Sequence, residues 1–180
     1  MKNDIKTKIF SKLSSEFAWK NEMQLPRIQK IVVNTGTGKR ARVDKERNKL
    51  VADRLVQITG QKPASRAARL SIAGFKIRQG DPIGQMVTLR GASAESFFEK
   101  LVHIALPRTK DFRGIAESSV DAMGNMTLGI TEHTIFPETS DENLSDVFSL
   151  SITIVTSTRS RDEALRFFTE LGVPFVTKTK

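Results

Sequence analysis

The stretch QMVTLRGASAESFFEKLVHIAL, residues 85–106, passes from one hydrophobic periodicity to another. At its start Val87 and Leu89 flank Thr88, and this alternation predicts a strand with one apolar and one polar face. From Ser93 onward the apolar residues recur at helical spacing, which predicts a helix capped by Ser93 and running to the end of the stretch. A strand followed by an amphipathic helix requires a core on one side of a sheet.

The same two periodicities predict the other elements. A capping box formed by Ser160 and Glu163 marks the start of the last helix. Helices are expected over about 3–19, 45–59 and 161–171, strands over 28–34, 64–72 and 150–156, and a hairpin over 118–130. Strands joined by short links favour antiparallel pairing. We therefore expect an α+β fold, with a single mainly antiparallel sheet and helices packed on one face. It forms one domain over residues 1–180, with an N-terminal helix (about 3–19) and a long basic loop (about 71–84).

The other face of the predicted sheet collects polar side chains. Alternation places hydroxyls, an amide and a guanidinium on this face, but no aromatic ring. An ordinary solvated sheet face is one interpretation. The other is an RNA-binding face, because Asn, Ser and Thr can bond the 2′-hydroxyls in the wide minor groove of an RNA helix. The residues concerned are Asn34, Thr88, Arg90, Thr127, Ser151 and Thr153.

The charge of the chain favours an anionic partner. The sequence holds 29 Lys and Arg against 20 Asp and Glu, a formal net charge of +9. Residues 61–90 contain six cations and a single acid, Asp81, whereas residues 138–146 contain acids and no cation. Such segregation suggests two different partner surfaces, with nucleic acid the leading candidate for the basic one. No cysteine, signal peptide or membrane-length apolar run is found, and the cytoplasm is the expected location.

The sequence gives no support to catalysis. The run from Gly36 to Arg40 resembles part of a phosphate-binding loop. That motif needs a glycine five residues before its Gly-Lys pair, where this chain has Val33, and Ser or Thr after the lysine, where this chain has Arg40. His103 lies among apolar helix residues and His133 lies in a polar stretch. The two histidines lack the spacing of a metal site. We expect no enzyme activity, no cofactor and no metal.

Several motifs, in order along the whole chain, resemble the family of the bacterial-type large-subunit ribosomal protein number five. The strongest lie at 60–63 (GQKP), 73–84 (AGFKIRQGDPIG) and 87–91 (VTLRG). Others are PRI at 26–28, LPR at 106–108, DFRG at 111–114, IFPE at 135–138 and LGVPF at 171–175. One departure is the hairpin from Val120 to Met126, where the family usually has two aromatic residues and an arginine that are absent here.

The resemblance implies a structural protein of the ribosome that joins 5S rRNA to the large subunit in the central protuberance. It also implies contact with the large-subunit rRNA, the P-site tRNA, neighbouring large-subunit proteins and a small-subunit bridge protein, without a membrane. The 5S rRNA-facing positions correspond to Asn34, Gln61 and Thr88; we add Lys62, beside Gln61, and Arg90 from the polar face.

The resemblance implies two further contact regions. The loop facing tRNA corresponds to about Ser71–Pro82, with Ser71, Phe75, Lys76 and Arg78 as its contact residues; we expect it to be mobile until tRNA binds. The bridge to the small subunit corresponds to Arg108, Arg113, Glu138 and Asp141. The alternative is an RNA-binding or assembly factor that shares the fold and acts away from the ribosome.

Overall fold

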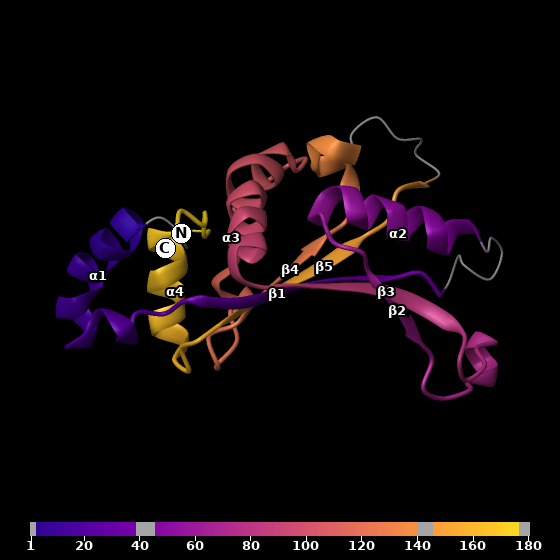
Figure 1. Ribbon diagram of the computed structural model, residues 1–180, viewed down its shortest axis with the longest axis horizontal. Helices are drawn as coiled ribbons and strands as arrows, with labels where there is room; N and C mark the ends of the chain where they lie inside the picture. The colour runs from indigo at the N-terminus through magenta and orange to yellow at the C-terminus, as the bar shows by residue number, and fades with distance from the viewer. Residues whose placement is uncertain (1–2, 39–45, 140–145, 177–180) are drawn as a thin grey trace. The chain divides into compact units, whose positions relative to one another are not determined.

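The computed structural model describes residues 3–38, 46–139 and 146–176 and confirms the α+β prediction (Figure 1). The antiparallel sheet has the strand order β2-β3-β1-β5-β4. Its strands are β1 (Ile28–Gly36), β2 (Ala64–Ala67), β3 (Pro82–Leu89), β4 (Met126–Ile130) and β5 (Leu150–Thr156). The helices are α1 (Asn3–Phe17), α2 (Glu46–Thr59), α3 (Gly91–Lys100) and α4 (Arg161–Glu170).

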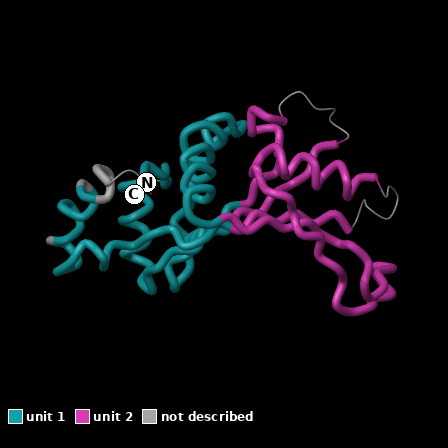
Figure 2. The backbone as a smooth tube through the Cα atoms, viewed as in Figure 1, with its two compact units in different colours: residues 1–31, 90–128, 153–180 teal, residues 32–89, 129–152 magenta. Residues whose placement is uncertain are grey.

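The chain divides into two compact units (Figure 2). Unit 1 comprises residues 1–31, 90–128 and 153–180, and unit 2 comprises residues 32–89 and 129–152. The single-domain organisation stays a prediction.

In unit 2, α2 packs against β3. The buried side of α2 carries Val51, Leu55 and Ile58 at helical spacing, each at most 1% exposed. The strands contribute Val33, Val87, Leu89, Leu150 and Ile152, which are almost fully buried. In this unit the apolar residues of the strands and of the helix therefore form one core, as the two periodicities predicted.

In unit 1, the core is rich in phenylalanine. Phe98 of α3 and Phe168 of α4 are buried, and their ring centroids lie 6.5 Å apart. Helices α1 and α4 contact each other, and two ion pairs join them: Lys12 with Glu170 at 2.7 Å and Arg166 with Glu16 at 3.0 Å. Both of these cations are therefore engaged within the protein.

The predicted strand over residues 64–72 is too long. Strand β2 ends at Ala67, where the register with β3 shifts, and the next residue, Ala68, bonds both Asp81 and Gly80 through its backbone. The partner strand begins at Pro82, earlier than the predicted Gln85. A proline at the first position of a strand costs no ladder hydrogen bond. The residues between the two strands form a structured loop.

One helix start was predicted wrongly, and at a second the predicted start is confirmed but the predicted capping is not. Helix α3 begins at Gly91, and its N-cap is Arg90, without a side-chain cap bond. The helical backbone continues through a π-turn at Leu101–Ala105 and a 3-10 turn at Leu106–Arg108, which accepts Pro107 because a first-turn N–H needs no partner. At α4 the N-cap Ser160 makes no side-chain bond. The Glu163 carboxylate accepts from the Thr158 hydroxyl instead, so there is no capping box.

The predicted hairpin over residues 118–130 is reduced to one bridge between Val120 and Met126. Its turn survives on Gly124 and Asn125, as expected, because Asp121 organises it. The Asp121 carboxylate accepts from the backbone N–H groups of Met123 (2.9 Å) and Asn125 (2.7 Å) and from Asn125 Nδ2 (3.0 Å). The bond from the Asn125 side chain is the main reason that the pKa of Asp121 lies below its usual value.

Candidate nucleic-acid interface

The strands have the two faces that the sequence predicted. In unit 2, Asn34 and Ser151 are exposed and Thr88 is half-buried, whereas their chain neighbours Val33 and Val87 are buried. These three residues therefore lie on the side of their strands away from the core of unit 2. Thr88 lies between two buried neighbours on β3, so its backbone is held in the sheet while its half-buried side chain faces away from the core. A side chain carried by a strand is suited to recognising a partner with a defined shape.

Unit 1 contributes its own polar strand residues. The hydroxyls of Thr127 on β4 and Thr153 on β5 lie 3.2 Å apart and share a hydrogen bond. Arg90 is exposed at the N-cap of α3. Arg90 belongs to unit 1, whereas Asn34 and Thr88 belong to unit 2, and we describe these two groups separately.

Gln61 and Lys62 lie in the connection between α2 and β2, and both are exposed. The Thr59 hydroxyl accepts from the Gln61 N–H at 3.3 Å and donates to the Gln61 carbonyl at 3.1 Å. This local pairing fixes the backbone at Gln61 while its side chain stays in solvent. The predicted RNA-facing residues of unit 2 are therefore all accessible.

The loop from Ser71 to Pro82, here called the arm loop, is built by its own hydrogen bonds. Ile72 and Ile77 form an antiparallel bridge around a 3-10 turn at Ala73–Phe75. The Ser71 hydroxyl accepts from the Gln79 N–H at 2.9 Å. Phe75 is 66% exposed, so its ring does not pack into the core. The expected mobility of the arm loop stays a prediction.

The cations from Lys62 to Arg78 differ from those of α1 and α4 in their pairing. In residues 46–139, the side chains of Lys62, Arg66, Arg69, Lys76 and Arg78 form no ion pair with any described residue. Asp81, the acid within this segment, accepts from the Arg78 backbone N–H at 2.8 Å. Unpaired cations on an exposed segment attract a polyanion, because binding releases counterions from its phosphates.

The predicted bridge residues are divided between the two units. Arg108 and Arg113 are exposed in unit 1, Glu138 is exposed in unit 2, and Asp141 lies outside the described residues. Lys39, which the sequence predicts to lie in a basic turn and to contact a phosphate, also lies outside them. The bridge stays a prediction.

Sequence reasoning missed two buried polar residues. His133 is fully buried, its ring stacks on Phe148 at 4.0 Å, and its Nδ1 accepts from the Phe148 N–H at 3.3 Å. Arg47, 9% exposed, donates to the Val147 carbonyl at 3.1 Å. Its spacing to Val51 and Leu55 places it on the buried stripe of α2, a signal that its charge obscured.

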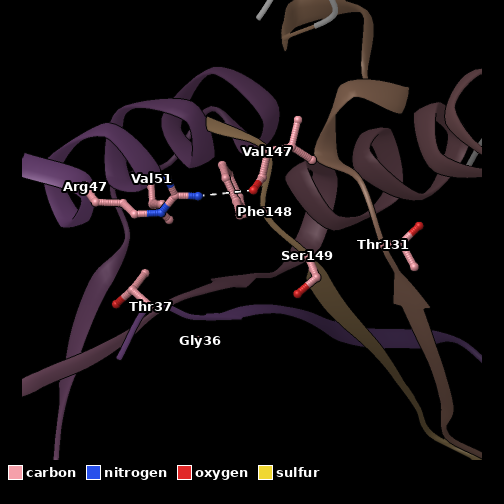
Figure 3. A pocket seen from close by; sticks show the side chains of 8 residues that line it. All are labelled: Gly36, Thr37, Arg47, Val51, Thr131, Val147, Phe148 and Ser149. Carbon is pink, nitrogen blue, oxygen red and sulfur yellow. Dashed lines mark hydrogen bonds between the residues drawn. The ribbon is translucent and has the colours of Figure 1, made fainter. Parts of the chain in front are cut away.

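Arg47 lines a pocket of about 280 Å³ in unit 2 (Figure 3). Its guanidinium reaches across toward Val147, and Phe148 lies beside that bond in the view. The pocket holds no nucleophile paired with a base among the described residues. It is lined by Gly36, Thr37, Arg47, Val51, Thr131, Val147, Phe148 and Ser149.

The described residues offer neither a metal site nor a membrane-spanning helix. No group of His, Cys, Asp and Glu there has the arrangement of a metal site. Among the helices described, none combines the length and the apolar character needed to cross a membrane.

Comparison with protein families agrees with this geometry. Residues 21–78 match the family model described as Ribosomal protein L5, and residues 82–175 match the model for the C-terminus of the same ribosomal protein family. These matches define a non-enzymatic structural protein of the large ribosomal subunit, acting in translation, with ribosomal RNA and proteins as its class of partner. The chain belongs to the ribosomal protein L5 family. The resemblance of the sequence motifs is thereby confirmed.

Proposed function

We propose that the protein binds 5S rRNA through the polar strand faces and the adjacent cations, and thereby anchors 5S rRNA in the large subunit. Asn34, Gln61 and Thr88 contact the RNA by hydrogen bonds, while Lys62 and Arg90 contact phosphates. The arm loop contacts the P-site tRNA, and Arg108, Arg113, Glu138 and Asp141 serve the bridge to the small subunit.

One observation carries the 5S rRNA proposal: a polar strand face whose described residues include no aromatic side chain lies in the same unit as cations that have no described ion-pair partner. Asn34, Thr88 and Ser151 offer an amide and two hydroxyls, and the cations from Lys62 to Arg78 have no ion-pair partner among the described residues. Single-stranded RNA is usually bound by stacking on exposed aromatic rings. Hydroxyls and amides suit the minor groove of a folded RNA helix instead. Competition between 5S rRNA and an unrelated RNA duplex tests this proposal.

The arm loop is supported as a separate contact region by its exposure and charge. Phe75, Lys76 and Arg78 project from a loop whose backbone bonds are made within the loop and to Ala68. Loops on rigid supports are frequent binding elements. The loop lies beyond the β2–β3 ladder, so it can engage a second RNA while the strands hold the first.

We expect the double substitution Lys76→Ala with Arg78→Ala to reduce protection of the P-site tRNA elbow in assembled ribosomes. Removing two exposed charges from the arm loop removes phosphate contacts with the tRNA. The affinity for 5S rRNA should change by less than about threefold, because distant surface charges are screened at physiological salt. Chemical footprinting of the tRNA and filter binding of 5S rRNA measure the two effects.

The matched control is Lys20→Ala with Arg159→Ala, which removes one exposed lysine and one exposed arginine of unit 1. This control should leave tRNA protection unchanged. Loss of 5S rRNA binding in the arm-loop variant, with tRNA protection unchanged, would reverse the two assignments.

A further inference from the structure

The pairing of β2 with β3 places an arginine on the polar face that the sequence motifs did not indicate. The two strands are antiparallel, with Ala64 opposite Met86 and Arg66 opposite Gly84. Directly paired residues project to the same face of a sheet, and so do alternate residues of one strand. Arg66, Gly84, Met86 and Thr88 therefore share one face, opposite the buried Val87 and Leu89.

The side chain of Arg66 contacts an uncharged sulfur atom, and no described carboxylate neutralises its charge. Its Nη2 lies 3.6 Å from Met86 Sδ, a weak acceptor without charge. This is its one interaction with the described residues, and no carboxylate among them pairs with it. Arg66 is exposed, so the remaining N–H donors of its guanidinium are open to solvent. The charge of this cation is therefore not used within the described part of the protein.

The residue opposite Arg66 on β3 is Gly84, which is buried. A Cβ atom at Gly84 would lie 3.0 Å from the Thr35 carbonyl oxygen and 4.0 Å from Arg66 Cβ. The glycine allows the backbones of β1 and β3 to approach closely, and it places no side chain opposite Arg66 on the partner strand. Arg66 itself is exposed, so a ligand can reach its guanidinium from solvent.

The position of Arg66 complements Thr88. Gly84 and Thr88 are four residues apart on β3, so their rungs are separated by roughly 13 Å along the strand. One end of this face carries a hydroxyl, which suits a groove, and the other carries an exposed guanidinium that no described carboxylate neutralises, which suits a phosphate oxygen. An RNA helix offers both groups on one surface.

We propose that Arg66 binds a backbone phosphate of the RNA helix whose minor groove meets Thr88 and Asn34. This assignment rests on the proposed 5S rRNA function of the polar face. The competing interpretation is structural. Strand β2 lies at the edge of the sheet, and an exposed cation on an edge strand prevents pairing with another chain.

The salt dependence of 5S rRNA binding separates these interpretations. For Arg66→Ala we expect affinity about tenfold lower at physiological salt, and a slope of log affinity against log salt reduced by about one, since one phosphate contact is lost. Arg66→Lys should keep the parent slope and lose less than about threefold, because a phosphate accepts a point charge. Arg159→Ala, which removes an exposed arginine elsewhere, should keep the parent slope.

Four results would overturn the assignment or the proposed function on which it rests. If the slope of log affinity against log salt is unchanged in Arg66→Ala, Arg66 does not contact a phosphate. Self-association of that variant on a size-exclusion column would then show that Arg66 prevents pairing of the edge strand β2 with another chain. If Arg66→Lys binds as weakly as Arg66→Ala but keeps the parent salt dependence, the guanidinium instead forms two hydrogen bonds with the edge of a base. A parent protein without preference for 5S rRNA contradicts the proposed function itself. If the parent prefers 5S rRNA and Thr88→Val weakens it, an unaffected Arg66→Ala contradicts the Arg66 assignment alone.

Discussion

Replacing Thr88 by valine should weaken binding of 5S rRNA by roughly 5- to 150-fold while leaving the fold intact. Valine has the shape of threonine and suits a strand, so the buried neighbours Val87 and Leu89 are not disturbed. The lost hydroxyl leaves an RNA group buried without a partner, which typically costs about 1–3 kcal/mol. Filter binding or calorimetry with 5S rRNA measures the change. Asn34→Ala should act in the same direction, for the same reason.

The matched control is Thr169→Val on α4. That threonine is exposed, and its hydroxyl donates to the Leu165 carbonyl of its own helix at 2.8 Å. This substitution makes the same chemical change away from the polar face, and it should leave 5S rRNA affinity unchanged. Parent-like binding by Thr88→Val would show that the face was assigned wrongly.

Replacing Gly124 by alanine should destabilise the protein by about 2–5 kcal/mol. Gly124 has φ +77°, a left-handed conformation that costs an L-residue roughly 1–2 kcal/mol. Its added Cβ would lie 2.7 Å from Thr158 Cγ2 and 3.2 Å from Ala164 Cβ, and such overpacking costs about 1–3 kcal/mol. The Gly124 carbonyl also accepts from the Thr156 hydroxyl at 2.8 Å, so the turn has little freedom to move. Urea unfolding followed by circular dichroism measures the effect.

Gly129→Ala provides the comparison for this prediction. Gly129 lies in β4, is exposed, and has no atom within 4 Å of a built Cβ. Its substitution should change the free energy of unfolding by less than about 0.5 kcal/mol. Equal stabilities of the two variants would mean that the turn at Gly124 does not pack against α4 as described.

The features with a clear period were predictable from the sequence. Strand β5 was predicted with its observed bounds, and the alternation around Val33, Val87, Leu128 and Ile152 indicated the correct buried face of each strand. Hydrophobic burial dominates in these segments, and the period of burial is visible in the sequence. The polar face followed directly from the same alternation.

The predictions from sequence failed where the structure of a segment depends on contacts with residues distant in the sequence. The end of β2 is set by the backbone bonds between Ala68 and residues 80–81, which no local pattern encodes. His133 was placed in a polar stretch, yet it is buried because Phe148 provides a ring to stack on and an N–H to accept. The position of Arg66 on the polar face needed the β2–β3 register, which motif comparison does not supply.

Competition binding of labelled 5S rRNA tests the central claim most directly. The protein is bound to labelled 5S rRNA at physiological salt and challenged with unlabelled 5S rRNA, tRNA or an unrelated duplex, and the measurement is repeated at rising salt. We expect unlabelled 5S rRNA to compete far better than the other two, with affinity falling steeply as salt rises because the cations release counterions from phosphates. Equal competition by 5S rRNA and the unrelated duplex would contradict the account and leave a basic protein without specific recognition of 5S rRNA.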